Sequence, residues 1–153
     1  MSYRPIISTT QCSHSDFVTI EPIEIKGRQF PWTKDQILEN LKDKNLNSVR
    51  TMLDYRCQAW CLFSVVDSDI VIHRLTVKDV NCIFDVLENL FKTMTYSPTK
   101  QGCHVSLDWP EYGTEDFLFR QLLSMGWSTD GLIKSHYSAY GESWDAIKLG
   151  RQF

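Results

Sequence analysis

The hydrophobic period changes within residues 69–94, and this change constrains the fold more than any other feature of the sequence. From Asp69 to Val77, successive side chains of a β-branched, apolar-rich run fall on alternating faces, which predicts a strand. After Asp79 the apolar residues recur three and four positions apart on one face of a helix: Val80, Ile83, Phe84, Leu87, Leu90 and Phe91. Asp79 or Asn81 can cap that helix by accepting from the free amides of its first turn. Because those amides and the helix dipole point the same way, the junction is predicted to form an anion-binding corner.

Length and charge limit the classes of protein to which the chain can belong. Its 153 residues predict one domain, residues 1–153, which is large enough to bury a core. The net charge of −3 argues against a general binder of nucleic acid or of an anionic membrane. No apolar run reaches the roughly 18 residues of a membrane span, and residues 1–8 lack the apolar core of a signal peptide. The cytoplasm is therefore the expected location.

The five cysteines are scattered along the chain, at Cys12, Cys57, Cys61, Cys82 and Cys103. An odd number of cysteines in a chain without a secretory signal predicts reduced thiols. Cys57 and Cys61 lie four positions apart, but no pair of CxxC elements occurs, so no metal site is expected. The thiols are interpreted as small buried hydrophobic groups.

Short strands and helices alternate along the rest of the chain. Thr33, with Gln36 three positions later, matches a capping box at the start of a helix. Two more helices are predicted over residues 16–27 and 114–126, and Pro22 is expected to shorten or kink the first. The other predicted strands cover residues 6–10, 49–54, 58–66, 104–109, 132–140 and 144–149. The order β-α-α-β-β-β-α-β-α-β-β predicts an α/β (α+β) fold with a mixed, mostly antiparallel sheet flanked by helices.

Four groups of short motifs follow one another along this framework. They are Ile23-Glu24 with Phe30-Pro31-Trp32-Thr33, residues 59–77, Leu122–Trp127, and Tyr137 with Asp145–Leu149. In order and spacing they resemble the GCN5-related N-acetyltransferase (GNAT) superfamily, in particular its ribosomal-protein-alanine N-acetyltransferases. The resemblance covers nearly the whole chain. It implies a GNAT-like sheet and the transfer of an acetyl or acyl group from acyl-CoA to an amine.

The main departure from this resemblance is the loop that binds the acetyl-CoA pyrophosphate. In the superfamily this loop reads Q/R-x-x-G-x-G/A, and here it falls on Cys82–Leu87, where Asp85 and Leu87 replace the two glycines. A Cβ obstructs the approach of a phosphate to the backbone, and a carboxylate repels it, so the loop is predicted to be degenerate. The amides of Asn81, Cys82, Ile83 and Phe84 can still meet a phosphate if the helix starts late.

The strand before that loop carries the other half of the implied cofactor site. The resemblance implies that main-chain groups of Leu75, Thr76 and Val77 pair with the pantetheine arm of acetyl-CoA. Such contacts use the backbone, so they tolerate changes of side chain.

Attack by an amine on a thioester needs a base for the ammonium proton, a donor to the oxyanion and an acid for the leaving thiolate. Tyr137 matches the tyrosine proposed as the acid in the enzymes that the chain resembles; the alternative is a structural strand tyrosine. Asp108 ends a predicted strand near the place of the family's glutamate base, and Glu111 is its rival. Either carboxylate can instead be a solvated loop residue. Leu122 stands where many relatives place a tyrosine that contacts CoA.

Three further residues are assigned to the substrate groove. His73 and His136 lie on predicted strands and can act as bases near neutral pH, although a lone strand histidine is more often structural. Trp109 follows a strand and precedes a loop, which makes it the best aromatic candidate to line a groove.

Three functions remain open on these observations. The first is an acyl-CoA-dependent N-acyltransferase whose acceptor is a protein N-terminus or a small amine, favoured by Tyr137 and the preserved framework. The second is a catalytically silent GNAT-fold module for binding or regulation, favoured by Asp85, Leu87 and Leu122. The third is an acyltransferase whose donor is an acyl-carrier protein, which shares the pantetheine arm.

Overall fold

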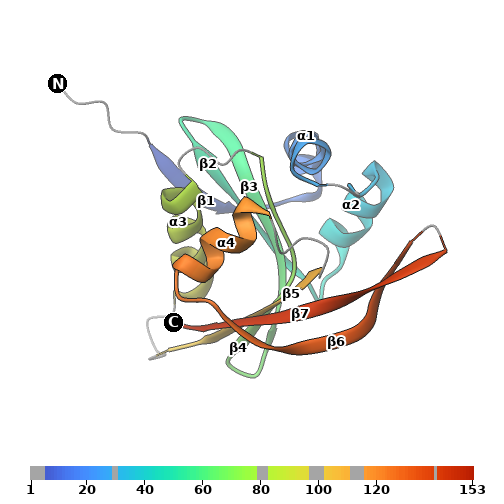
Figure 1. The fold of residues 1–153 in the computed structure, drawn as a ribbon. Coiled ribbons are helices and arrows are strands. Elements are labelled where there is room, and N and C mark those ends of the chain that lie inside the picture. The colour runs from blue at the N-terminus through green and yellow to red at the C-terminus, as the bar shows by residue number, and fades with distance from the viewer. Residues whose placement is uncertain (1–5, 29–30, 79–82, 97–101, 111–115, 140) are drawn as a thin grey trace.

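The computed structural model describes residues 6–28, 31–78, 83–96, 102–110, 116–139 and 141–153 (Figure 1). Its strands are β1 (Ile7–Gln11), β2 (Asn47–Leu53), β3 (Arg56–Val66), β4 (Asp69–Val77), β5 (His104–Pro110), β6 (Ser128–Ala139) and β7 (Glu142–Gln152). Its helices are α1 (Phe17–Gly27), α2 (Lys34–Lys42), α3 (Ile83–Thr95) and α4 (Phe117–Ser124), and a short 3-10 turn, His14–Asp16, precedes α1. None of the helices in these ranges is long and apolar enough to cross a membrane.

All seven of these strands belong to one sheet, in the order β1-β2-β3-β4-β5-β7-β6. Neighbouring strands pair antiparallel, except β4 and β5, which run parallel and are connected through α3. The prediction of a mixed, mostly antiparallel sheet flanked by helices is therefore confirmed.

The helices lie on both faces of the sheet (Figure 1). Apolar residues of α3 and α4 pack with alternate strand residues in the larger core, which includes Leu75 of β4 and Trp109 of β5. Apolar residues of α1 and α2 pack on the other face, against Trp60 and Leu62 of β3. Because successive side chains of a strand point to opposite faces, these two cores assign each strand residue to one face.

Local chemistry explains where α2 begins and how α1 accommodates a proline. The Thr33 hydroxyl accepts from the Gln36 amide at 3.3 Å, and the Gln36 side chain accepts from the Thr33 amide at 2.8 Å, which confirms the predicted capping box. The expectation that Pro22 shortens or kinks α1 is wrong in one respect, because the helix continues to Gly27. Proline leaves the carbonyl of Val18 without its helical donor, and Val18 is exposed, so water can solvate that carbonyl.

Several predicted boundaries shift by two to four residues, including the starts of α4 and β6 and both ends of β7. The last helix starts at Phe117 with Asp116 as its N-cap, later than the predicted start at residue 114, which lies outside the described residues. The strand predicted from Leu132 begins at Ser128, because β6 pairs with β7 as far back as Gly150.

Candidate active site

A gap opens between β4 and β5, two strands that the structure describes over their full length. Their parallel pairing covers only Ile70–Ile72 with Val105–Leu107, so the ends of the two strands, 73–77 and 108–110, do not pair with each other. The β3–β4 ladder shifts its register just there, with His73 as the extra residue on β4. A bulge bends its strand, which explains why β4 turns away from β5 at this point. We call this opening the β4–β5 gap.

Backbone groups of Leu75 and Val77 point into the β4–β5 gap. The amide of Lys78 donates to the carbonyl of Gln58 at 2.7 Å, which marks these residues as a hydrogen-bonded pair of the β3–β4 ladder. In an antiparallel ladder such pairs alternate with positions whose N–H and C=O groups point away from the partner strand. Leu75 and Val77 occupy positions of the second kind, so their polar groups face the side from which β5 has diverged.

The opposite wall of the gap carries the Tyr137 hydroxyl. Cys103 and Phe153 exchange two backbone hydrogen bonds, of 2.9 and 2.8 Å, and the β5–β7 register has no shift between them and Asp108. By the same alternation, the carbonyl of Asp108 points away from β7 and toward β4. The Tyr137 hydroxyl donates to that carbonyl at 3.0 Å, which places the phenol at the gap.

The Asp108 carboxylate and the His136 imidazole lie together on the rim of the gap. Their Oδ2 and Nε2 atoms are 3.3 Å apart, and each side chain is about a third exposed, at 34% and 37%. Val105, Leu107 and Trp109 point into the larger core, so Asp108 projects from the other face, the one that α1 and α2 cover. The imidazole also packs edge-on against Tyr137, with ring centroids 4.7 Å apart.

A bulge in β6 brings His136 and Tyr137 to this position. Between the pairs Ile133–Ala146 and Tyr137–Trp144, three residues of β6 face only one residue of β7, Asp145. Ser135 has a φ of 52°, in the left-handed region that a side chain rarely adopts, and its amide donates to the Asp145 carboxylate at 2.8 Å. This hydrogen bond stabilises the turn of the strand that presents His136 to Asp108.

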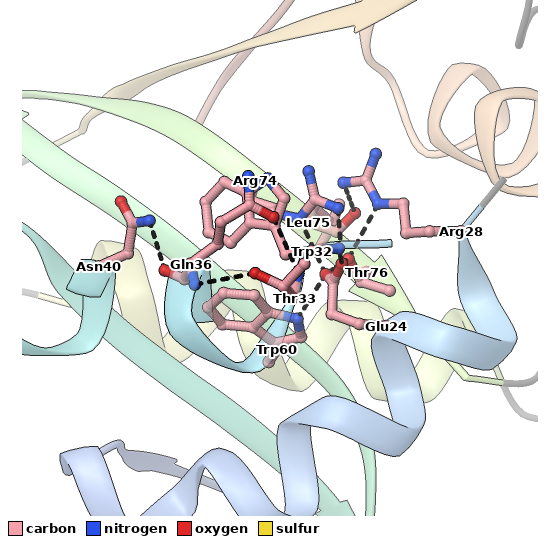
Figure 2. Close-up of polar contacts among 10 residues, drawn as sticks. All are labelled: Glu24, Arg28, Trp32, Thr33, Gln36, Asn40, Trp60, Arg74, Leu75 and Thr76. Atoms are coloured by element: carbon pink, nitrogen blue, oxygen red, sulfur yellow. Dashed lines mark hydrogen bonds and ion pairs between the residues drawn. The ribbon is translucent and has the colours of Figure 1, made fainter. Parts of the chain in front are cut away.

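Across the gap, a buried carboxylate ties α1 to β4 (Figure 2). Glu24 of α1 is fully buried and accepts from both Nε and Nη2 of Arg74, from the Trp60 indole at 3.0 Å and from the Thr76 hydroxyl at 2.7 Å. The backbone amide of Trp32 completes the set at 3.0 Å, and the Trp32 ring stacks on the Arg74 guanidinium at 4.2 Å. We call Glu24, Trp32, Trp60, Arg74 and Thr76 the Glu24 cluster.

The charge of Glu24 is stabilised despite its burial. Burial alone would raise the pKa of this carboxyl, but the hydrogen bonds and the positive charge of Arg74, with the Trp32 amide and the Thr76 hydroxyl, lower its pKa to about 2. Glu24 is therefore an anion at neutral pH, and it neutralises Arg74. This cluster holds the helix and the strand together rather than offering a free charge to a substrate.

A second arginine reaches the open edge of β4 itself. Arg28 caps the C-terminus of α1, and its Nη2 donates to the backbone carbonyl of Leu75 at 2.8 Å (Figure 2). Its Nε donates to the Thr76 hydroxyl at 3.0 Å, which in turn donates to Glu24. The guanidinium thus lies on the gap side of β4.

The remaining predicted site residues are distributed as follows. His73 lies at the β4 bulge, is exposed, and shares a hydrogen bond of 2.8 Å with Ser64. Trp109 is buried against Phe119 in the larger core, on the face opposite the Asp108 carboxylate. Leu122 is fully buried in α4. The described residues do not include Asn81, Cys82 and Glu111.

Asp85 and Leu87, the two residues of α3 that stand in place of the glycines, differ in exposure. Leu87 is fully buried, and its side chain packs in the larger core. Asp85 is exposed in the first turn, together with Phe84 and the buried Ile83. The first amides of a helix have no partner inside it, so the amides of Ile83, Phe84 and Asp85 are the described groups that can meet an anion there.

None of the described cysteines is joined in a disulfide. Burial raises the pKa of Cys12 and Cys57 to about 11, and it also raises the pKa of Cys61. Among the described residues, no three His, Cys, Asp or Glu side chains are grouped so that they can hold a metal ion.

Solved structures resemble this fold closely, although neither a family model nor a curated protein matches the chain. The ribosomal-protein-S18-alanine N-acetyltransferase of Escherichia coli matches 95% of this chain and 92% of its own, with a TM-score of 0.74 and 14% identity. Arabidopsis thaliana NAA60 in complex with acetyl-CoA matches 97% of this chain and 99% of its own, with a TM-score of 0.71 and 12% identity. The spermidine/spermine N-acetyltransferase SpeG of Vibrio cholerae matches 96% and 95%, with a TM-score of 0.70 and 9% identity. The chain therefore has the fold of the GCN5-related N-acetyltransferases.

Proposed function

We propose that the protein is an N-acyltransferase that transfers an acyl group from acyl-CoA, with acetyl-CoA as the expected donor, to an amine. The observation that carries this proposal is the β4–β5 gap. Backbone donors and acceptors of Leu75 and Val77 that face away from β3 lie on one wall, and the Tyr137 hydroxyl lies on the other. One wall can align an amide-bearing chain, and the other can supply a proton beside it.

The pantetheine arm suits the open edge of β4 because it carries two amide groups on an extended chain. An extended chain with amides binds an exposed strand edge as an added strand does, through backbone hydrogen bonds. Leu75 and Val77 offer such groups, while Thr76 lies between them with its backbone turned toward β3. An N–H group of this edge is also the proposed donor for the oxyanion that develops on the thioester carbonyl.

The start of α3 is the proposed place for the pyrophosphate. The amides of Asn81, Cys82, Ile83 and Phe84 are its proposed donors, aided by the helix dipole. Asp85 is exposed in the same turn and opposes an anion there. We therefore expect acetyl-CoA to bind more weakly than to a loop with two glycines.

His136 is the proposed base, and Asp108 is the residue that orients it. An imidazole can take a proton from the acceptor ammonium near neutral pH, and a carboxylate at 3.3 Å fixes its orientation and stabilises the imidazolium. The neutral amine then forms the bond to the thioester carbon, and the bond from carbon to sulfur breaks. Tyr137 donates its phenolic proton to the leaving thiolate, and a second proton from the new amide nitrogen restores the phenol. The net reaction releases one proton to water. Glu111, the rival base, stays an untested prediction.

The acceptor is proposed to be a primary amine, either a protein N-terminus or a small polyamine. Structural neighbours act on both kinds, a ribosomal-protein alanine in one and spermidine or spermine in another. A second candidate function is favoured by Asp85: a catalytically silent module in which this carboxylate keeps phosphate away from α3.

An acetylation assay with acetyl-CoA separates these candidates. Two acceptors are tested separately, spermidine and a peptide whose N-terminal residue is alanine. The variant is His136→Gln, and its matched control is His14→Gln, in the exposed turn before α1. Loss of a positioned base lowers turnover by about 100-fold or more, so His136→Gln should be slow and His14→Gln should match the wild type.

Two outcomes would count against the proposal. If the wild-type protein acetylates neither acceptor, the silent module becomes the better account. If His136→Gln turns over as fast as His14→Gln, the base is another group.

A further inference from the structure

The open edge of β4 is already occupied by a side chain of the protein. The Leu75 carbonyl, which faces the β4–β5 gap, accepts from Arg28 Nη2 at 2.8 Å. The same guanidinium donates through Nε to the Thr76 hydroxyl at 3.0 Å, and that hydroxyl donates to the fully buried Glu24. Two hydrogen bonds, one of which is linked to the Glu24 cluster, therefore fix Arg28 against the edge of the strand.

A chain that pairs with β4 must lie where this guanidinium lies. Paired backbones run about 4.7–4.9 Å apart, and the Arg28 nitrogen sits within that distance of β4, on the gap side. An arm amide that donates to the Leu75 carbonyl would also share the acceptor that Arg28 uses. A carbonyl can accept two hydrogen bonds, so it is the shared space that makes occupation by Arg28 and by an extended arm mutually exclusive at Leu75.

We propose that Arg28 is a latch that holds the acyl-CoA groove closed and must swing away before the pantetheine arm can pair with β4. This inference rests on the proposed function and adds a regulatory step to its site. Arg28 caps the end of α1 with an extended backbone, at φ −130° and ψ 139°, so a change of side-chain rotamer can move the guanidinium without unwinding the helix. Opening the latch costs free energy, and this cost reduces the free energy of binding the donor. When only a small fraction of the protein has the latch open, the apparent affinity for the donor is lower by that fraction.

The test is calorimetric titration of CoA into the wild type, Arg28→Ala and Lys26→Ala. Lys26 is an exposed cation near the end of the same helix, so its variant is matched in charge change. CoA is an anion, so the loss of a cation alone weakens its binding, whereas the loss of a latch strengthens it. Hydrogen bonds from a charged donor are strong enough that Arg28→Ala should bind CoA roughly tenfold to a hundredfold more tightly. Lys26→Ala should bind as the wild type does, or slightly more weakly.

The fold of each variant is checked first by thermal unfolding. If Arg28→Ala does not fold, Arg28→Gln replaces it, because glutamine removes the charge and keeps much of the stem. If CoA binding is detected for Arg28→Ala but not for the wild type or Lys26→Ala, this result supports the latch as strongly as a large gain in affinity does. Equal or weaker binding by the Arg28 variant overturns the latch but leaves the proposed function standing. Failure of every protein to bind CoA overturns the proposed function, and the latch with it.

Discussion

Replacing Glu24 by glutamine removes one negative charge from the centre of the Glu24 cluster and keeps the shape of the side chain. In the wild type the carboxylate accepts from Trp32, Trp60, Arg74 (twice) and Thr76. The variant presents an NH₂ group to at least one of these donors, and it leaves the Arg74 guanidinium, which is only 11% exposed, without its counter-charge. Both effects destabilise the folded state.

The pKa of Glu24 sets the size of the loss. The folded protein lowers this pKa from 4.5 to about 2, and each unit corresponds to about 1.4 kcal/mol, so the ionised group stabilises the fold by about 3 kcal/mol at neutral pH. Because the carboxylate is fully buried, solvent screening does not reduce this figure much. Breaking a buried ion pair by removing one partner costs about 3–5 kcal/mol in other proteins. We therefore expect Glu24→Gln to lower the free energy of unfolding by about 3 kcal/mol.

The same group predicts how stability depends on pH. A carboxyl whose pKa is lower in the folded state stabilises the protein fully above its unfolded pKa, here 4.5. That contribution is lost as the pH falls from 4.5 toward about 2, because the unfolded chain then binds the proton more readily than the folded one. The wild type should therefore lose more stability than Glu24→Gln does between pH 5 and pH 3.

Urea unfolding at pH 7 and at several values between pH 5 and 3 measures both quantities. The double variant Glu24→Gln with Arg74→Met is the control, because it removes both charges and should recover part of the loss. A loss below about 1 kcal/mol for Glu24→Gln at pH 7, or parallel acid profiles for the variant and the wild type, would refute this view of the cluster.

Three further predictions concern the donor site and the proposed acid. Asp85→Gly should tighten CoA binding, because it removes an exposed carboxylate from the first turn of α3, whereas Leu87→Gly should destabilise the fold by about 4 kcal/mol or more, since Leu87 is fully buried. Calorimetry and urea unfolding measure the two effects, and unchanged affinity in Asp85→Gly would show that phosphate does not meet this turn. Tyr137→Phe should lower turnover at least about tenfold and leave CoA affinity unchanged, because it removes a proton donor and keeps the ring; steady-state kinetics with wild-type rates would assign the acid elsewhere.

Much of the fold follows from patterns that are local in the sequence. Thr33 and Gln36 are three residues apart, so their capping box needs no knowledge of the rest of the chain. The change of period after Val77 likewise predicts both β4 and α3, because each element buries one face of its own residues. Boundaries are less predictable where a neighbouring strand decides them, as β7 does for the start of β6.

The candidate site is less predictable because its contacts join distant residues. Asp108 and Tyr137 were selected by resemblance, and their hydrogen bond spans 29 positions. The β6 bulge brings His136 to Asp108, and its left-handed residue is Ser135. A glycine at this position would have indicated a bulge, but a serine does not, so the sequence carries no signal for the bulge.

The Glu24 cluster and the Arg28 contact were not predicted at all. A signal for Glu24 exists, since it lies on the same helical face as Ile20 and next to Ile23, both of which are buried. A glutamate on such a face needs a buried partner, but the sequence does not say that Arg74, 50 positions away, provides it. Arg28 has no comparable signal, because its acceptors are the Leu75 carbonyl and the Thr76 hydroxyl, which lie 47 and 48 positions away.

A nuclear magnetic resonance titration that follows the backbone amides of Leu75 and Val77 would decide whether the β4–β5 gap receives the pantetheine arm. Both amides face the gap, so pairing with the arm should shift their resonances and slow their hydrogen exchange as acetyl-CoA is added. Amides of β3 that face β2 serve as internal controls and should not change. If Leu75 and Val77 stay unperturbed at millimolar acetyl-CoA, the open edge of β4 is not a donor site, and the function of this fold lies in another surface of the protein.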